Sequence, residues 1–169
     1  MFHLCKWYCD LTTNDGTVLI GYWSQLRWGL LRLSHASYIF FRSDGSLRQR
    51  GTLFAGAGPQ LCENEMNWSC QPLQLIGSWR ARAQSVKQVL LEGHEGSVKW
   101  DCHMPTADVQ IEFEGEILRG VGYVEQLTMT LPPWRLPFAE LRWGPSHGGG
   151  PSRRLDRLVR RSGTTLELH

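Results

Sequence analysis

The sequence lacks the features that mark several classes of protein. No apolar run approaches the roughly 18 residues of a membrane-spanning helix. The net charge is only +2, from 18 basic and 16 acidic residues, so no strong field for nucleic acid or a membrane surface is expected. The first ten residues show no basic start followed by an apolar stretch, which predicts no secretory signal. We therefore expect a cytoplasmic protein.

The motifs of common catalytic and cofactor sites are also missing. There is no glycine-rich phosphate loop, no nucleophile elbow and no HExxH zinc motif. The five cysteines are odd in number and none has CxxC spacing, which argues against a disulfide framework. Cys102 followed by His103 is half of a metal site at most, and reduced, partly buried thiols are the favoured interpretation. No metal or other cofactor is predicted.

Alternation of apolar and polar residues dominates what is present, and few windows have helical spacing. Turn signals such as Asn14-Asp15-Gly16 and Asp44-Gly45 separate many of the alternating segments. Nine strands with short connections predict an all-β fold, an antiparallel barrel or sandwich. The predicted strands are 3–11, 17–28, 30–42, 46–54, 66–79, 85–92, 96–103, 108–114 and 116–131, with a loop at 55–65 and room for a helical turn at 80–90.

The composition changes near Gly144. We predict a β-barrel domain over residues 1–143, followed by a tail over 144–169 that is rich in glycine, proline and arginine. The tail allows a short helix between Ser152 and Gly163. Its arginines either face solvent or bind an acidic partner. A change of reading frame in the gene would produce the same shift in composition, and both origins stay open here.

Alternation also assigns side chains to the two faces of each strand. In 121–131 the apolar face includes Tyr123, Leu127 and Met129, and Glu125 lies in the middle of it. A carboxylate on an apolar face must be paired, hydrogen-bonded or protonated. Glu125 is therefore the first catalytic candidate. A structural salt bridge to an arginine, or a bulge that turns the side chain outward, is the alternative.

His35 is the polar exception on the apolar face of 31–41 and is the second catalytic candidate. Paired with Glu125, its imidazole could move protons near neutral pH. A hydrogen-bonded core histidine is the alternative. In 3–11 the same reasoning turns Trp7 and Cys9 inward and leaves Asp10 in solvent.

The eight tryptophans indicate either a heavily packed core or an aromatic-lined cavity. Tyr22 and Tyr123 either line such a cavity as hydroxyl donors or reach backbone partners in the core. An apolar, aromatic interior suits a hydrophobic ligand better than a phosphate or a sugar. The predicted ligand-binding residues are Tyr22, Trp28, Trp7, Trp100, Trp134, Arg142 and Trp143, and the predicted catalytic residues are Glu125, Tyr123 and His35.

Four short segments carry a family resemblance: Lys6-Trp7-Tyr8-Cys9-Asp10, Gly120-Val121-Gly122-Tyr123-Val124-Glu125, Pro132-Pro133-Trp134-Arg135-Leu136-Pro137 and Leu141-Arg142-Trp143-Gly144. On these residues the chain resembles the lipocalin-like group of calycin-type barrels. That group includes carotenoid 1,2-hydratases, tocopherol cyclases and lipocalin-like cyclases that perform Diels–Alder steps. Its members often carry two such domains, whereas this chain has room for one. Closing strands of such a barrel are expected after Trp143, where this chain turns to glycine, proline and arginine. If the tail is native, the barrel is open or completed by a second copy, and an exposed edge favours a homodimer.

The resemblance implies chemistry on alkenes or polyenes without a redox cofactor. A protonated Glu125 in a dry cavity would supply the proton, and aromatic faces would stabilise a cation. A pericyclic route would need only shape and a donor such as Tyr123 or Tyr22. Three functions stay open: a hydratase, cyclase or isomerase acting on a hydrophobic small molecule, a non-catalytic carrier of such a molecule, and an interaction module that uses the arginine-rich tail.

Overall fold

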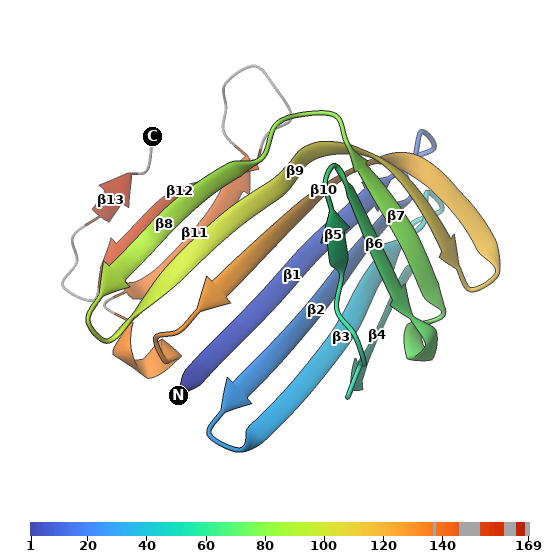
Figure 1. Cartoon of the computed structure of the whole chain (residues 1–169). Coiled ribbons are helices and arrows are strands. Elements are labelled where there is room, and N and C mark those ends of the chain that lie inside the picture. Colours follow the sequence, from blue (N-terminus) through green and yellow to red (C-terminus); the bar gives the residue numbers. More distant parts are fainter. Residues whose placement is uncertain (137, 146–152, 161–164, 168–169) are drawn as a thin grey trace.

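The computed structural model describes the backbone of residues 1–136, 138–145, 153–160 and 165–167, and side chains as far as residue 136. Its elements are almost all strands (Figure 1). In chain order they are β1 (Phe2–Thr12), β2 (Val18–Trp28), β3 (Leu31–Phe41), β4 (Leu47–Leu53), β5 (Gln60–Cys62), β6 (Glu65–Cys70), η1 (Gln71–Leu73), β7 (Leu75–Ala81), β8 (Val86–Gly93), β9 (Gly96–Phe113), β10 (Glu116–Met129), η2 (Pro133–Arg135), β11 (Phe138–Pro145), β12 (Arg153–Arg160) and β13 (Thr165–Glu167). Among the described residues, no helix has the length and apolar character needed to span a membrane.

Strands β1 to β10 form one antiparallel sheet in the order β4-β3-β2-β1-β10-β9-β7-β6-β5, with β8 also paired to β9. The sheet curves strongly, so that β5, β6 and β7 lie in front of β1 to β3 (Figure 1). Within the described residues the end strands β4 and β5 do not pair, so the barrel is open. The predicted fold class, an all-β antiparallel barrel or sandwich, is confirmed. The homodimer through an open edge stays a prediction.

A smaller sheet, β11-β12-β13, follows the main one. β12 covers Arg153–Arg160, where the sequence had suggested a short helix. Its backbone pairs with β11, as Leu158 does with Leu141, so long-range pairing replaces the local helical pattern here. The domain boundary between 1–143 and 144–169 stays a prediction, and β11 runs across it.

The main core lies between the two curved halves of the sheet. Its fully buried side chains include Trp79, Phe40, Phe113, Leu11, Leu19, Met66, Leu73, Leu75, Met104, Ile111 and Val124. We call the side of the sheet that carries them the core face and the opposite side the outer face. Trp68 reaches across from β6 to Gly21 on β2, where a Cβ would come within 2.8 Å of its ring. Side chains thus fill this half of the barrel.

Strands β1 and β10 approach each other closely at Gly122. A Cβ at this position would overlap the carbonyl oxygen of Asp10 and lie 2.7 Å from Val109 Cγ2. Only glycine fits so close a backbone approach. The register then shifts between Gly122 and Glu125, so that Val124 enters the main core. This bulge sets the direction of the side chains that follow.

Candidate functional site

A cluster of aromatic and acidic side chains occupies the outer face of β1, β2, β9 and β10. Register places Glu125 opposite Tyr8 on one side and opposite Cys102 on the other, and Tyr8 opposite Tyr22. Antiparallel partners share a face, so the four strands bring these side chains together. We call this set the Glu125 cluster; it consists of Tyr8, Asp10, Tyr22, Trp100, Cys102, Tyr123 and Glu125.

Glu125 is held by two neutral donors. The indole Nε1 of Trp100 and the hydroxyl of Tyr123 both donate to its Oε2 atom, each at 2.8 Å. Trp100 and Tyr123 are themselves buried. Within the described residues no arginine forms an ion pair with Glu125. The carboxylate is therefore satisfied by aromatic donors on a largely apolar face.

Burial sets the protonation state of the two groups beside Glu125. It raises the pKa of the Tyr123 phenol well above the ordinary value, and the charge of Glu125 adds to the effect. Burial also raises the pKa of the Cys102 thiol, to about 11. Both groups are thus protonated at neutral pH. Tyr123 can act as a hydrogen-bond donor, and Cys102 is a poor nucleophile and metal ligand.

The raised pKa of Cys102 predicts a loss of stability in alkali. The unfolded thiol ionises near pH 9.0 and the native thiol only near pH 11, so the unfolded state loses its proton first as the pH rises. We expect the unfolding free energy of the wild type, relative to Cys102→Ala, to fall by about 1–3 kcal/mol between these values. Urea denaturation of both proteins at pH 8 to 11 measures this, and parallel curves would contradict it.

Tyr8 and Asp10 belong to the cluster although the sequence left Asp10 in solvent. Asp10 is buried, and the Tyr8 hydroxyl donates to its Oδ2 atom at 3.0 Å. The Tyr8 ring stands edge-on to Tyr22, with ring centroids 5.2 Å apart. The placement of Asp10 was wrong because the outer face of β1 is buried at this position, although it is exposed at Lys6. Tyr8, two residues earlier on the same face, was the sequence signal that could have indicated burial there.

An apolar strip continues from the Glu125 cluster along the outer face. Leu90 and Leu127 touch both this cluster and the neighbouring group around Phe2 and Met129. At the far end the Trp134 ring packs against Trp28 and Phe2, with ring centroids 5.3 and 6.1 Å apart. Trp28 and Trp134 remain 52% and 55% exposed. The strip thus has an open aromatic end and a buried polar end.

The other predicted site residues lie elsewhere. His35 is on the outer face of β3 and pairs with Ser24, three strands away from β10, or about 14 Å at the spacing of a sheet. The structure therefore does not bring it to Glu125. Trp7 is on the core face, where its ring stacks on His103 at 5.0 Å. Arg142 and Trp143 lie in β11, and their side chains are outside the described residues.

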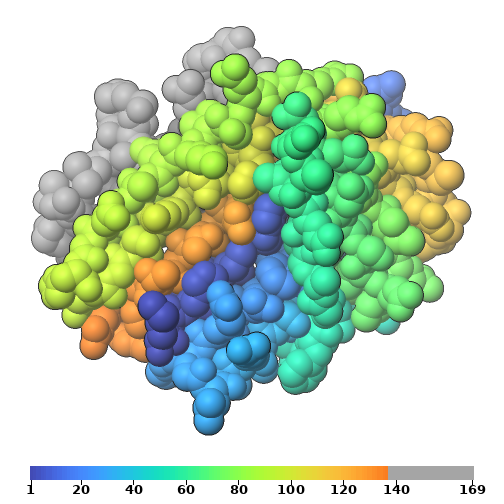
Figure 2. Space-filling model, in the orientation of Figure 1, coloured from blue at the N-terminus to red at the C-terminus, as the bar shows by residue number. Residues whose placement is uncertain are grey.

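The core face of β1, β9 and β10 carries a second polar group. The Gln126 amide accepts a hydrogen bond from His103 Nε2 through its Oε1 atom (3.0 Å) and donates one to Cys5 Sγ through its Nε2 atom (3.1 Å). The surface is hollowed over β1 and β10, between β9 and β5 (Figure 2). Burial raises the pKa of Cys5, which keeps it a thiol rather than a nucleophilic thiolate. Among the described residues no group of three His, Cys, Asp or Glu side chains could hold a metal ion.

Comparison with known proteins does not assign the chain to a family. No family model matches the chain, and no curated protein does. Among solved structures the chain is similar to a protein of Nitrosomonas europaea described as a candidate AttH, with a TM-score of 0.44 and 11% identity. The match covers 98% of this chain and 67% of that one. So distant a likeness says nothing about function.

Proposed function

We propose that this protein binds an elongated hydrophobic small molecule along the apolar strip, and that Glu125 transfers a proton to it in a cofactor-free reaction. The observation that carries the proposal is the Oε2 atom of Glu125, fixed by two neutral aromatic donors. Hydration and cyclisation are implied by the lipocalin-like resemblance, and isomerisation is a third reaction on the same class of compound. The same strip would also serve a non-catalytic carrier.

The shape of the strip supports an elongated ligand. Phe2 lies at its open end and Tyr8 at the Glu125 cluster, six residues apart on β1. At the rise of an extended strand this is about 20 Å. A polyene or terpenoid chain of similar length would lie against leucine and aromatic side chains, with the buried polar groups at one end and the exposed Lys6 beside Leu127 along the way. Such a surface orients an apolar ligand by shape and by a few polar contacts.

Isomerisation of a double bond fits the polar end best among the three reactions. The protonated carboxyl group of Glu125 would donate its proton to one carbon of the double bond, and the carboxylate so formed would then take a proton from a carbon on the far side of the cationic centre. This shift needs no oxidant, reductant or water. Tyr123 remains protonated and keeps the carboxylate in place. Cationic character on the substrate would be stabilised by the Tyr8 and Trp100 rings.

Glu125→Gln should separate catalysis from binding. Native mass spectrometry of the protein from its own host, with extraction of the bound compound, comes first and supplies the substrate. With that compound we expect Glu125→Gln to bind within about threefold of wild type and to lose about 10²–10⁴-fold in turnover.

Glu112→Gln is the matched control, because Glu112 is exposed on β9, opposite Ile117 and outside the cluster. Full turnover by Glu125→Gln would contradict the catalytic role. If the wild type binds the extracted compound tightly but does not convert it, the protein is a carrier and not an enzyme for that compound. A wild-type protein that binds no hydrophobic compound would contradict both.

A further inference from the structure

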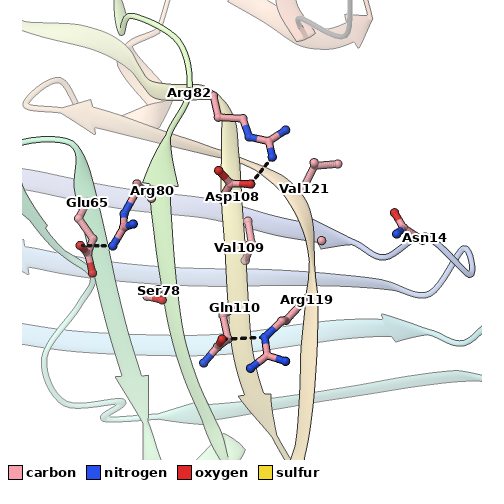
Figure 3. A pocket seen from close by; sticks show the side chains of 11 residues that line it. Asn14, Glu65, Ser78, Arg80, Arg82, Asp108, Val109, Gln110, Arg119 and Val121 are labelled. Carbon is pink, nitrogen blue, oxygen red and sulfur yellow. Dashed lines mark hydrogen bonds and ion pairs between the residues drawn. The ribbon is translucent and has the colours of Figure 1, made fainter.

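A pocket of about 520 Å³ lies on β7, β9 and β10, beyond Tyr123 along β10 (Figure 3). Its volume is in the range of sites for small metabolites. Arginine side chains come into it from two directions: Arg80 and Arg82 from β7 and the turn after it, and Arg119 from β10. The polar side chains between them belong to β7 and β9.

Sheet register fixes this arrangement. One row across the sheet holds Arg80, Asp108 and Val121, and the next row holds Ser78, Gln110 and Arg119. Neighbouring members of a row are about 5 Å apart. The side chains therefore stand on a rigid three-strand platform rather than on loops, which suits a specific binding site.

The arginines are incompletely neutralised. Arg82 forms an ion pair with Asp108, whereas the closest approach of Arg80 to Glu65 is 3.8 Å. Arg119 donates through Nε to the neutral amide oxygen of Gln110 at 2.9 Å. Among the described residues no carboxylate pairs with Arg119. Three guanidinium groups thus face two carboxylates, and the terminal nitrogens of Arg119 have no anionic acceptor.

We infer that this pocket binds the oxyanion group of a small molecule, either a phosphate or a carboxylate. The Arg80 side chain, which points toward Glu65 (Figure 3), would turn to the anion from the β7 side, and Arg119 would approach it from the β10 side. The Ser78 hydroxyl would donate between them. Guanidinium groups bind such anions through two parallel hydrogen bonds. Asp108 neutralises the charge of Arg82. Its own negative charge would repel the anion. The inference uses none of the residues of the Glu125 cluster and does not depend on the proposed function.

Opposite effects of two substitutions test the site. Inorganic pyrophosphate and citrate are titrated separately into the full chain by isothermal calorimetry, at constant ionic strength because salt screens exposed charges. We expect at least one anion to bind with a millimolar or tighter Kd. Arg119→Gln should weaken it about tenfold, and Asp108→Asn should tighten it several-fold. Binding of pyrophosphate identifies a phosphate ligand, and binding of citrate a carboxylate ligand.

Arg32→Gln is the control, because Arg32 is exposed on β3 and lies outside the pocket. It should leave the Kd unchanged. The inference is overturned if neither anion binds in the millimolar range, if Arg32→Gln and Arg119→Gln weaken binding equally, or if Asp108→Asn weakens it. Thermal melting of each variant confirms that the protein tested is folded.

Discussion

Gly122→Ala is expected to lose at least about 3 kcal/mol of unfolding free energy. The added Cβ would overlap the carbonyl oxygen of Asp10, which is backbone and cannot rotate away. That carbonyl also accepts a hydrogen bond from the buried Trp79 indole at 2.9 Å, which holds it in place. The two central strands would have to separate, and a loss of this size is a large part of the stability of a typical domain.

Urea denaturation of wild type and variant measures the effect. Gly93→Ala is the matched control, because Gly93 lies at the end of β8 and a Cβ there would meet nothing within 4 Å. Its unfolding free energy should stay within about 0.5 kcal/mol of wild type. Equal stability of the two variants would show that β1 and β10 are not so closely apposed at Gly122.

The strands were predictable because apolar and polar residues alternate over most of their length. The sequence predicted two separate strands, 96–103 and 108–114. The structure has no break between them, since β9 runs through both as one strand. Along β9, the residues up to Cys102 pair with β8, and those from Ala107 onward pair with β7. Pro105 lies between the two partners, where its missing N–H breaks no ladder hydrogen bond. Pairing of this kind involves distant segments, and a local pattern does not reveal it.

The faces of β2 and β3 were harder to assign. The sequence turned Tyr22 and His35 inward, but Trp23 and Tyr38, of the opposite parity, are the ones buried in the main core. Apolar residues occur on both faces of these strands, so alternation alone does not choose between them. For β1 the predicted inward residues Trp7 and Cys9 do lie in the main core.

The Glu125 cluster was partly predictable. Glu125 and Tyr123 share a face because they are two residues apart on one strand, and Trp100 comes into reach only through the pairing of β9 with β10. The same pairing excludes His35, since β1 and β2 lie between β3 and β10. Sheet order is a global property of the chain. A sequence can suggest the polar residues of such a site but not which of them meet.

Trp79→Ala is expected to lose about 3–5 kcal/mol of unfolding free energy. Its side chain is fully buried, and its truncation leaves a cavity beside Gly77, whose Cβ position is already occupied by the indole ring. The substitution also removes the hydrogen bond to the Asp10 carbonyl. Trp134→Ala, at an exposed tryptophan of the strip, should cost less than about 1 kcal/mol. Equal losses in urea denaturation would contradict the packing described for Trp79.

Trp79→Phe comes closer to the contribution of the hydrogen bond, because it removes the N–H donor but only part of the ring volume. We expect it to cost about 1–3 kcal/mol, the penalty for leaving a buried carbonyl without its partner. The same carbonyl anchors Asp10, whose side chain accepts from Tyr8 in the Glu125 cluster. Trp79→Phe should therefore also weaken binding of the hydrophobic ligand. Unchanged affinity would show that the core and the outer face are independent at this point.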